Sequence, residues 1–446
     1  MPDIEELARR IIDDAKTNEE VEVVASRSVE TEIRVYEKEV ESLTRAESKG
    51  VGIRVVVDGR VGFAHCGSFD EESIREALES ARDNARFATP DEFAGLAEPD
   101  GITPTPLDLV DPDFHRASTE EKIALAKELE KMALLGDSRI SKIESTDYAD
   151  VESEGFILST KGIKSHTRAT FAYVSASAVA NQGDDTKTGG GYSVARGFGG
   201  IDLEKAASDV VKRATELLGA EKPSSRRLVA VLDPRITATL LAIVGGSLSA
   251  DSAQKGRSMF GNRLGEEVAS SRFDLMDDPT EPLARGASQF DGEGLACRRN
   301  HLIKDGVLQT FLYDSYTARK ENRTSTASAT RGYSSTPSPG PMALILRPGT
   351  KSQDEIVAEI KDGILIRSIS GVHSGVNPIS GDFSVGAEGF LIKNGQIASP
   401  FKEATISSTI QKMLMGTVEI GSDIEWLPGI SAGPTVAIEE MNLSGV

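Results

Sequence analysis

The chain has 446 residues, of which 39% are hydrophobic and 27% are charged, a composition typical of folded rather than disordered proteins. Lysine and arginine total 50 against 70 aspartates and glutamates, and this net charge of −20 argues against a nucleic-acid backbone or an anionic membrane as the main partner. A chain of this length exceeds one ordinary hydrophobic core, so we expect two or more domains.

The N-terminal stretch is acidic, and its apolar residues recur at helical spacing from Ile4 to Ala15. This pattern predicts an amphipathic helix rather than a signal peptide. No run of apolar residues approaches the length of about 18 that a membrane span requires. The two cysteines, Cys66 and Cys297, cannot form a disulfide framework and are typical of the reducing cytoplasm.

Strand-like runs follow the first helix. Residues 21–26 and 31–40 are rich in β-branched residues and predict strands. Asp58-Gly59 between two apolar runs predicts a hairpin, because both central residues of a type I′ turn need positive φ. The helix expected after this hairpin takes Ser68 or Asp70 as its N-cap.

The following region combines a loop, a helix and further strands. Residues 89–113 are rich in proline, aspartate and glycine and predict a loop, after which Ser118 and Glu121 form a capping box. Residues 140–180 predict strands joined by a turn at Lys161-Gly162. The glycine-rich stretch 183–200 lacks the G-x-x-x-x-G-K-[ST] pattern of a phosphate-binding loop, and we expect it to be a mobile connector.

A short polar segment that contains a proline, 220–227, is the best candidate for a domain boundary. It follows a helix that begins at Asp202 and precedes a buried strand and a helix from Thr237 to about Leu248. We therefore expect an N-terminal domain over 1–220 and a C-terminal domain over 221–446.

The C-terminal half is dominated by predicted hairpins, one of them at Asp305-Gly306. Residues 315–341 are rich in serine, threonine, proline and glycine and predict a long exposed loop, and loops of this length in compact domains are usually functional or disordered. Hairpins build antiparallel sheets. The fold class that we expect is α+β, with an α/β N-terminal domain of a sheet and packed helices and a β-rich antiparallel C-terminal domain.

The residues suited to hydrolysis form no familiar local pattern. The five histidines are too far apart in sequence for two of them to share a helix, so no helix supplies a histidine pair to zinc. His373 and Ser374 are adjacent, and adjacent residues of a strand point to opposite faces. The G-x-S-x-G pattern of serine hydrolases is also absent.

The stretch 371–408 predicts a hairpin with its turn at Asn394-Gly395, and the glycines within its strands are typical of bulges or of close backbone approach. Two interpretations stay open. The hairpin is either a twisted surface feature or a sheet edge left free for an extended chain to pair with. In the second case the substrate-binding residues are Gly381, Asp382, Phe383, Ser384, Gly386, Gly389 and Phe390.

The same stretch resembles the C-terminal motif of the TldD/PmbA family, in which V-N-x-x-x-G-[DEQ]-[FY] leads into G-F-x-[IV]-x-N-G-x-I. The matching sequences in this chain are VNPISGDF and GFLIKNGQI, and the sequence GDFSVGAEGF is more similar to the PmbA (TldE) branch than to the TldD branch. The resemblance implies that the C-terminal domain is partly barrel-like.

TldD-type chains of this family are zinc peptidases with H-E-x-x-x-H on a helix and a cysteine ligand in the tail. Residues 237–266 of this chain resemble that zinc-binding helix. In this comparison the two histidine positions fall on Leu241 and Gly246, or one residue later on Ala242 and Ser247. The glutamate position falls on Ala242 or Ile243, and the tail 424–438 has no cysteine. The resemblance therefore implies a chain with no catalytic residues and no metal or cofactor of its own.

The function that the resemblance implies is that of a TldE/PmbA-type subunit in a heterodimeric metallopeptidase. A TldD-type partner would carry the zinc, and this chain would help to hold an extended, unfolded peptide. Three alternatives stay open. They are a stand-alone peptide- or protein-binding regulator of the gyrase-modulator type, a hydrolase with its own non-zinc nucleophile, and a homodimer with another activity.

Overall fold

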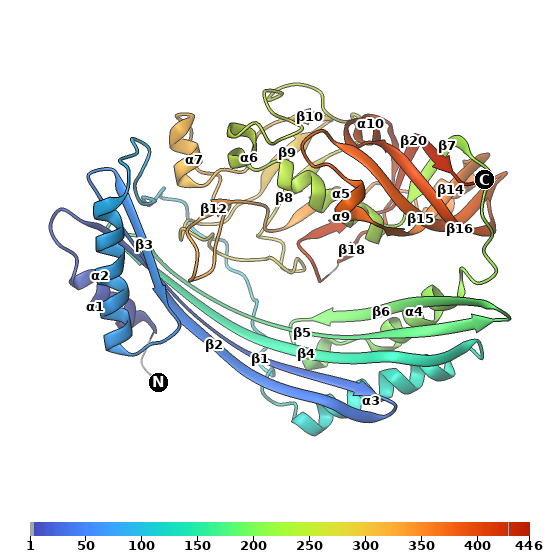
Figure 1. Ribbon diagram of the computed structural model, residues 1–446, viewed down its shortest axis with the longest axis horizontal. Helices are drawn as coiled ribbons and strands as arrows, with labels where there is room; N and C mark the ends of the chain where they lie inside the picture. The colour runs from blue at the N-terminus through green and yellow to red at the C-terminus, as the bar shows by residue number, and fades with distance from the viewer. Residues whose placement is uncertain (1–3, 427) are drawn as a thin grey trace.

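The computed structural model of the chain describes residues 4–426 and 428–446 (Figure 1). Leu427, which belongs to the tail that the family comparison concerns, lies outside the described residues. The described strands form three six-stranded sheets and one two-stranded ribbon. The chain is thus an α+β protein, as expected.

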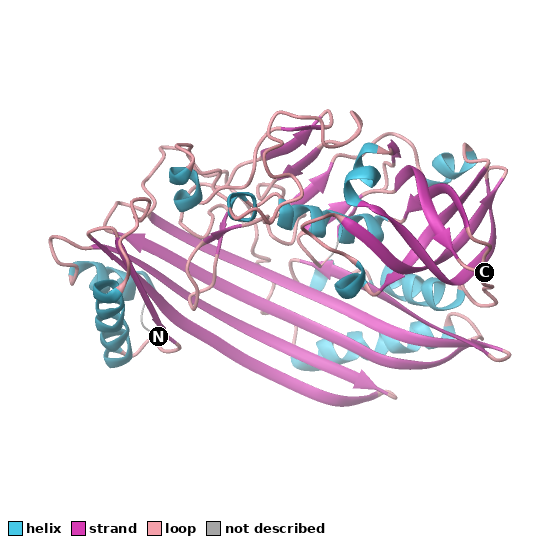
Figure 2. Cartoon of the chain, turned by 45° about the horizontal axis from the view of Figure 1, so that its top comes forward, coloured by secondary structure: helices cyan, strands magenta, loops and turns pink. Residues whose placement is uncertain are grey.

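The first sheet, here called the N-terminal sheet, is antiparallel throughout and has unusually long strands. It curves along the C-terminal part of the molecule, and Figure 2 shows its strands running side by side along the length of the molecule. In spatial order its strands are β3 (Arg60–Cys66), β2 (Glu39–Val57), β1 (Glu20–Tyr36), β4 (Ile140–Ser159), β5 (Lys164–Gln182) and β6 (Asp185–Ala195).

Two pairs of helices pack against this sheet at opposite ends of the same strands. They are α1 (Ile4–Asp13) and α2 (Glu71–Phe87) at one end, and α3 (Thr119–Leu135) and α4 (Leu203–Thr215) at the other. On β1, Val21 and Val23 belong to the first core, and Ile33 and Val35 belong to the second. All four positions are odd-numbered, so both cores lie on one face of the sheet.

The opposite face of the N-terminal sheet meets the C-terminal part of the chain. Val24 and Ile157 from the sheet pack with Leu295 and Ala327 in a small buried cluster. Beside this cluster, the buried Glu22 carboxylate is paired with Arg54 from β2 and with Arg331 from the segment 315–341. Apolar packing and buried ion pairs therefore join the two parts.

The structure corrects the prediction of a mobile connector at 183–200. Residues 185–195 form β6, the edge strand of the N-terminal sheet, and η1 (Phe198–Gly200) follows it. Gly189 and Gly191 are required by packing, because a Cβ on Gly189 would lie 2.1 Å from the backbone nitrogen of Ala214 in α4 and one on Gly191 would lie 2.3 Å from the carbonyl oxygen of Ala206. Glycine-rich composition here reflects a helix lying directly on the strand, and not a flexible linker.

The strands expected at 21–26 and 31–40 are also corrected. Residues 20–36 form one continuous strand, and the chain turns at Glu37 and Lys38, which both have positive φ, 50° and 66°. The three hairpins predicted from Asp-Gly and Asn-Gly pairs are confirmed. Each of these pairs has positive φ at both residues.

The second sheet closes into a five-stranded barrel, which confirms the barrel-like expectation. Its strands are β16 (Gln396–Thr409), β15 (Asp382–Lys393), β14 (Asp362–Ser370), β7 (Arg226–Leu232) and β20 (Val436–Ser444), and β16 pairs with β20. β17 (Thr417–Ile420) continues the sheet beside β20, and β7 runs parallel to β14. The helices of this region are α5 (Pro234–Ser247), α8 (Gln353–Ala358), α9 (Val372–Gly375) and α10 (Ile410–Met415).

The third sheet packs beside the barrel and shares its hydrophobic core. In order its strands are β10 (Val307–Leu308), β9 (Asn300–Lys304), β8 (Leu275–Asp277), β13 (Leu344–Leu346), β19 (Ser431–Gly433) and β18 (Glu425–Trp426). The remaining elements are α6 (Ala250–Gln254), α7 (Ser315–Lys320) and the ribbon of β11 (Ala329–Thr330) and β12 (Ser338–Pro339). None of the helices in the described part of the chain is long and apolar enough to cross a membrane.

The segment 315–341 is less exposed than its composition predicts. Its first residues form α7, in which Thr317 and Ala318 are buried, and further along Ala327 and the side chain of Arg331 are buried. The prediction of an exposed loop therefore holds for residues 320–324 and 334–336 and is wrong for the buried positions, near which the Arg331 side chain pairs with Glu22 of β1.

Candidate functional site

Helix α5 lies between the barrel and the polar residues that form the candidate site. Asp233 is its N-cap and accepts a hydrogen bond from the backbone of Arg235, while Pro234 occupies the first turn, where its missing N–H costs nothing. The helix therefore begins three residues before the predicted Thr237. Leu240, Leu241 and Val244 pack into the barrel core, as an apolar helix face requires.

The positions that the family comparison picks out on α5 divide between core and surface. Leu241 and Ser247 are buried, and the Ser247 hydroxyl donates to the carbonyl of Pro378. Ala242 and Gly246 lie one turn apart on the exposed side, and a Cβ added to Gly246 would meet no atom within 4 Å. In the described ranges, no three His, Cys, Asp or Glu residues are grouped so as to hold a metal ion.

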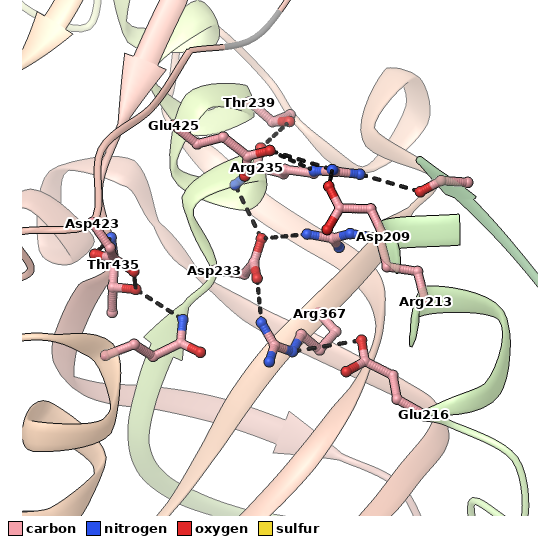
Figure 3. A network of polar contacts seen from close by, with 12 residues as sticks. Asp209, Arg213, Glu216, Asp233, Arg235, Thr239, Arg367, Asp423, Glu425 and Thr435 are labelled. Carbon is pink, nitrogen blue, oxygen red and sulfur yellow. Dashed lines mark hydrogen bonds and ion pairs between the residues drawn. The ribbon is translucent and has the colours of Figure 1, made fainter. Parts of the chain in front are cut away.

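A buried polar network ties the first turn of α5 to the N-terminal sheet layer (Figure 3). The Asp233 carboxylate pairs with Arg213 of α4 at 3.3 Å and with Arg367 of β14. Arg367 in turn lies 3.6 Å from Glu216, a carboxyl whose pKa is raised by burial. The N-cap of α5 is thus held by one arginine from each of the two layers.

Arg235 extends this network toward the sheet. Its guanidinium bonds to Asp209 of α4 at 2.9 Å and to Glu425 of β18 at 3.3 Å, and it lies over the ring of Tyr192 at 4.4 Å from the centroid. The Tyr192 hydroxyl donates to Glu425, and burial raises the pKa of this tyrosine. These contacts fix β18 and β6 on either side of the first turn of α5.

Next to this network lies a pocket with a volume of about 390 Å³ between the N-terminal sheet and the third sheet. Aromatic side chains from both sides face it, namely Phe171, Tyr192 and Trp426, and the exposed Leu283 adds apolar surface. Concave sites with apolar walls and a few polar groups are typical ligand sites. Three cationic side chains line this pocket, Arg196, Arg285 and Lys205, and Lys205 is paired with Asp209 and Glu425.

The candidate substrate-binding residues of β15 are split between the two faces of the barrel wall. Phe383 points into the barrel core, whereas Asp382 and Ser384 are exposed on the outer face and Gly386 is half-exposed. On the same strand Glu388 pairs with Lys187 of β6 at 2.7 Å. The outer face of β15 is therefore linked to the edge of the N-terminal sheet.

The remaining candidates have packing roles. Gly381 adopts a φ of +82°, and a Cβ on Gly389 would lie 1.9 Å from the carbonyl oxygen of Leu365 in β14. Phe390 packs on a second apolar cluster beneath α8. The pairing register shifts near Glu388, so the bulge suggested by the glycines is present.

The open sheet edge that was one interpretation of this hairpin is wrong. β15 pairs with β16 along its length and with β14 from Gly386 onward. At its beginning, Val376 bridges to Phe383, and Asn377 donates to the carbonyl of Asp382. An extended chain therefore has no free backbone edge to pair with on this strand.

Sequence reasoning did not find the pocket residues. Arg196 lies in the stretch that was expected to be a connector, and Arg285 lies in a loop that carried no motif. The only signal was Trp426, the single tryptophan of the chain, in a tail of otherwise ordinary composition. These segments meet only through the tertiary fold.

Comparison with known proteins agrees with this architecture. The chain matches the PmbA/TldA metallopeptidase domain 1 over residues 21–85, the central domain over 112–218 and the C-terminal domain over 225–445. These three matches place the chain in a metallopeptidase family. It belongs to the PmbA/TldD family.

Several individual proteins are similar over nearly their full length. Metalloprotease PmbA of Escherichia coli O157:H7 is 26% identical over 95% of this chain and 92% of its own. A candidate modulator of a DNA gyrase from Thermotoga maritima has a crystal structure with a TM-score of 0.92 and 26% identity, covering 99% of this chain and all of that one. TldE from Thermococcus kodakarensis, at 23% identity, a TM-score of 0.89 and 99% coverage of both chains, shows the shared fold alone.

Proposed function

We propose that this chain is the metal-free TldE/PmbA-type subunit of a heterodimeric TldD/TldE metallopeptidase that processes unfolded peptides. The observation that supports this proposal is the composition of α5. Catalytic zinc needs about three protein ligands, an open position for water and a nearby base. The positions concerned here hold Leu241, Ala242, Ile243, Gly246 and Ser247, none of which suits that task.

The residues of α5 thus do not fit zinc. The zinc and the base belong to a TldD-type partner in this proposal. The exposed side of α5, with Ala242 and Gly246, leaves free space beside the helix for a peptide or a partner segment. The chain's task is then to complete the peptide-binding cavity.

A role for β15 in peptide binding remains part of the proposal, in a changed form. Because the strand has no free edge, contact with a peptide falls to the exposed side chains of Asp382 and Ser384. Phe383 and Gly389 act through packing of the barrel instead.

Reconstitution with a TldD-type chain tests the proposal. Each chain is purified separately, zinc is measured by elemental analysis after mild chelator treatment, and cleavage of an unfolded peptide is followed for each chain and for the mixture. We expect cleavage by the mixture, no cleavage by this chain, and no stoichiometric zinc in it.

Two results would overturn this assignment. Cleavage by this chain alone that resists chelator would indicate a nucleophile of its own, and cleavage that chelator removes would indicate its own metal site. Failure of the two chains to co-purify, together with tight peptide binding by this chain alone, would favour a stand-alone regulator.

A further inference from the structure

The pocket beside α5 contains two arginines that lack a carboxylate partner within the described ranges. Arg196 donates from Nη2 to the carbonyls of Pro282 at 2.8 Å and Ala284 at 2.9 Å, and so holds the turn that carries Arg285. The Arg285 guanidinium lies over the ring of Phe171, 4.0 Å from its centroid. No hydrogen bond or ion pair joins Arg285 to any residue that the structure describes.

The acidic residues of the pocket are already engaged elsewhere. Glu425 bonds to Arg235 and Tyr192, and Asp202 caps α4 by accepting from the backbone of Lys205. Glu30 is the carboxylate that favours the charged form of Arg285, and it makes no contact with Arg285 short enough to be an ion pair. The pocket therefore has two cations whose hydrogen-bonding capacity is largely unused.

Electrostatics at the two guanidinium groups favours a bound anion. Burial lowers the pKa of both arginines, and the charge of Arg285 lowers the pKa of Arg196 further. Unpaired charge in a half-buried site is unfavourable, and an incoming anion offsets that cost. Planar guanidinium groups match a carboxylate with two parallel hydrogen bonds.

The walls of the pocket select what the anion is attached to. Phe171, Tyr192 and Trp426 give three aromatic surfaces, and Leu283 is 66% exposed. Such walls bury an apolar group next to the anion, whereas a free phosphate or sulfate would leave them in contact with water. A volume of about 390 Å³ has room for a single terminal residue of a peptide with its carboxylate.

We propose that this pocket binds the C-terminal carboxylate of a peptide whose last side chain is apolar. Arg285 is the main contact with the carboxylate, and Arg196 is a positioning residue that also contributes charge. The inference rests on the proposed function, since it takes a peptide as the ligand. It adds that this subunit recognises the end of the peptide rather than its middle.

Binding to the purified chain alone, without a partner or zinc, tests the inference. Trp426 is the only tryptophan, so its fluorescence reports directly from the pocket. The probes are an acetylated pentapeptide ending in leucine with a free carboxylate, the same peptide as a C-terminal amide, and an amidated peptide with one internal glutamate. We expect saturable binding of the free acid and at least about tenfold weaker binding of both amides, the loss typical of a charge-assisted hydrogen bond.

Variants separate the carboxylate contact from general effects. Arg285→Gln should weaken binding of the free acid about tenfold or more and leave amide binding unchanged, and Arg285→Lys should restore part of it. The control is Arg168→Gln, which removes one positive charge from β5, where Arg168 is paired with Glu152. It should leave the binding of all three peptides unchanged. Thermal melting of each variant confirms that it is folded.

Equal binding of acid and amide, or a folded Arg285→Gln that binds the acid as well as the wild type, would overturn the inference. Saturation by inorganic phosphate at the same concentration as the free acid would also overturn it, since the apolar walls would then have no role. Failure of the two-chain peptidase assay leaves this binding result unaffected, so the two proposals fail separately.

Discussion

Single buried carboxyl groups set part of the pH response of this molecule, and Asp277 at the end of β8 is the clearest case. Its Oδ1 accepts hydrogen bonds from the backbones of Met342 at 2.9 Å and Ala343 at 2.6 Å. Its Oδ2 is buried and has no hydrogen-bond partner among the residues described. Burial, together with the charge of Asp278, raises the pKa of Asp277 to about 6.

Asp277→Asn should therefore change how stability depends on pH. A carboxyl whose folded pKa is raised stabilises the fold at low pH, and this contribution is lost as pH rises from about 4 through 6. Between pH 4 and pH 8 the free energy of unfolding of the wild type should fall by about 2 kcal/mol relative to Asp277→Asn, the value for roughly two pKa units less the part already lost at pH 4. Denaturant titrations at several pH values measure this.

The control is Asp354→Asn at the exposed start of α8, whose pH curve should follow that of the wild type. Parallel curves for Asp277→Asn and the wild type would show that Asp277 is ionised in the fold across this range.

At the scale of helices and strands, local chemistry explains what the sequence could predict. Asp58-Gly59 and Asn394-Gly395 marked their hairpins because both residues tolerate positive φ, whereas the turn at Glu37-Lys38 carried no such residue and was missed. The strand β6 was missed because two of its glycines, Gly189 and Gly191, serve the contact with α4.

Contacts between distant residues were beyond any local pattern. The barrel closes where Thr405 of β16 pairs with Ser444 of β20, and the sequence of neither strand alone predicts this pairing. The same holds for the site. Helix α5 was predictable from its apolar run, but the approach of Arg196 to the turn before Arg285 depends on the packing of two sheets.

The glycines of β6 give a test at this scale. Gly189→Ala would place a Cβ 2.1 Å from the backbone of α4, so strand and helix must separate, and we expect a loss of about 2 kcal/mol or more in unfolding free energy. Gly190→Ala is the matched control, because its nearest neighbour is 3.4 Å away, an ordinary contact. Equal denaturation midpoints for the two variants would contradict this account.

At the scale of the whole molecule, the two parts are held together by buried charge as well as by apolar contact. Arg331 comes from the segment 315–341 and has 1% of its side chain exposed, where it pairs with Glu22 of β1. Arg54 bonds to the same carboxylate at 2.9 Å and lies 3.6 Å from Glu293. Removing one of these charged side chains leaves the remaining buried charges without full neutralisation.

Arg331→Met should lower the free energy of unfolding by about 3 kcal/mol, the scale for breaking a buried ion pair. It should also accelerate amide hydrogen exchange over residues 326–331, since the segment loses its attachment to the sheet. Arg323→Met, in the same segment but 44% exposed and 3.4 Å from Glu321, should change stability by no more than about 1 kcal/mol. Fast exchange of this segment in the wild type would show instead that it is not anchored.

The length of β1 has a consequence for how the N-terminal sheet is aligned. The strand passes through one core at Val23 and another at Ile33, and each core is covered by its own pair of helices. A slip of one residue would turn the apolar side chains at both ends to the wrong face at once. Packing against either helix pair thus favours the same strand register. The length of the strand between Val23 and Ile33 therefore sets the distance between the two cores, roughly 33 Å at about 3.3 Å per residue.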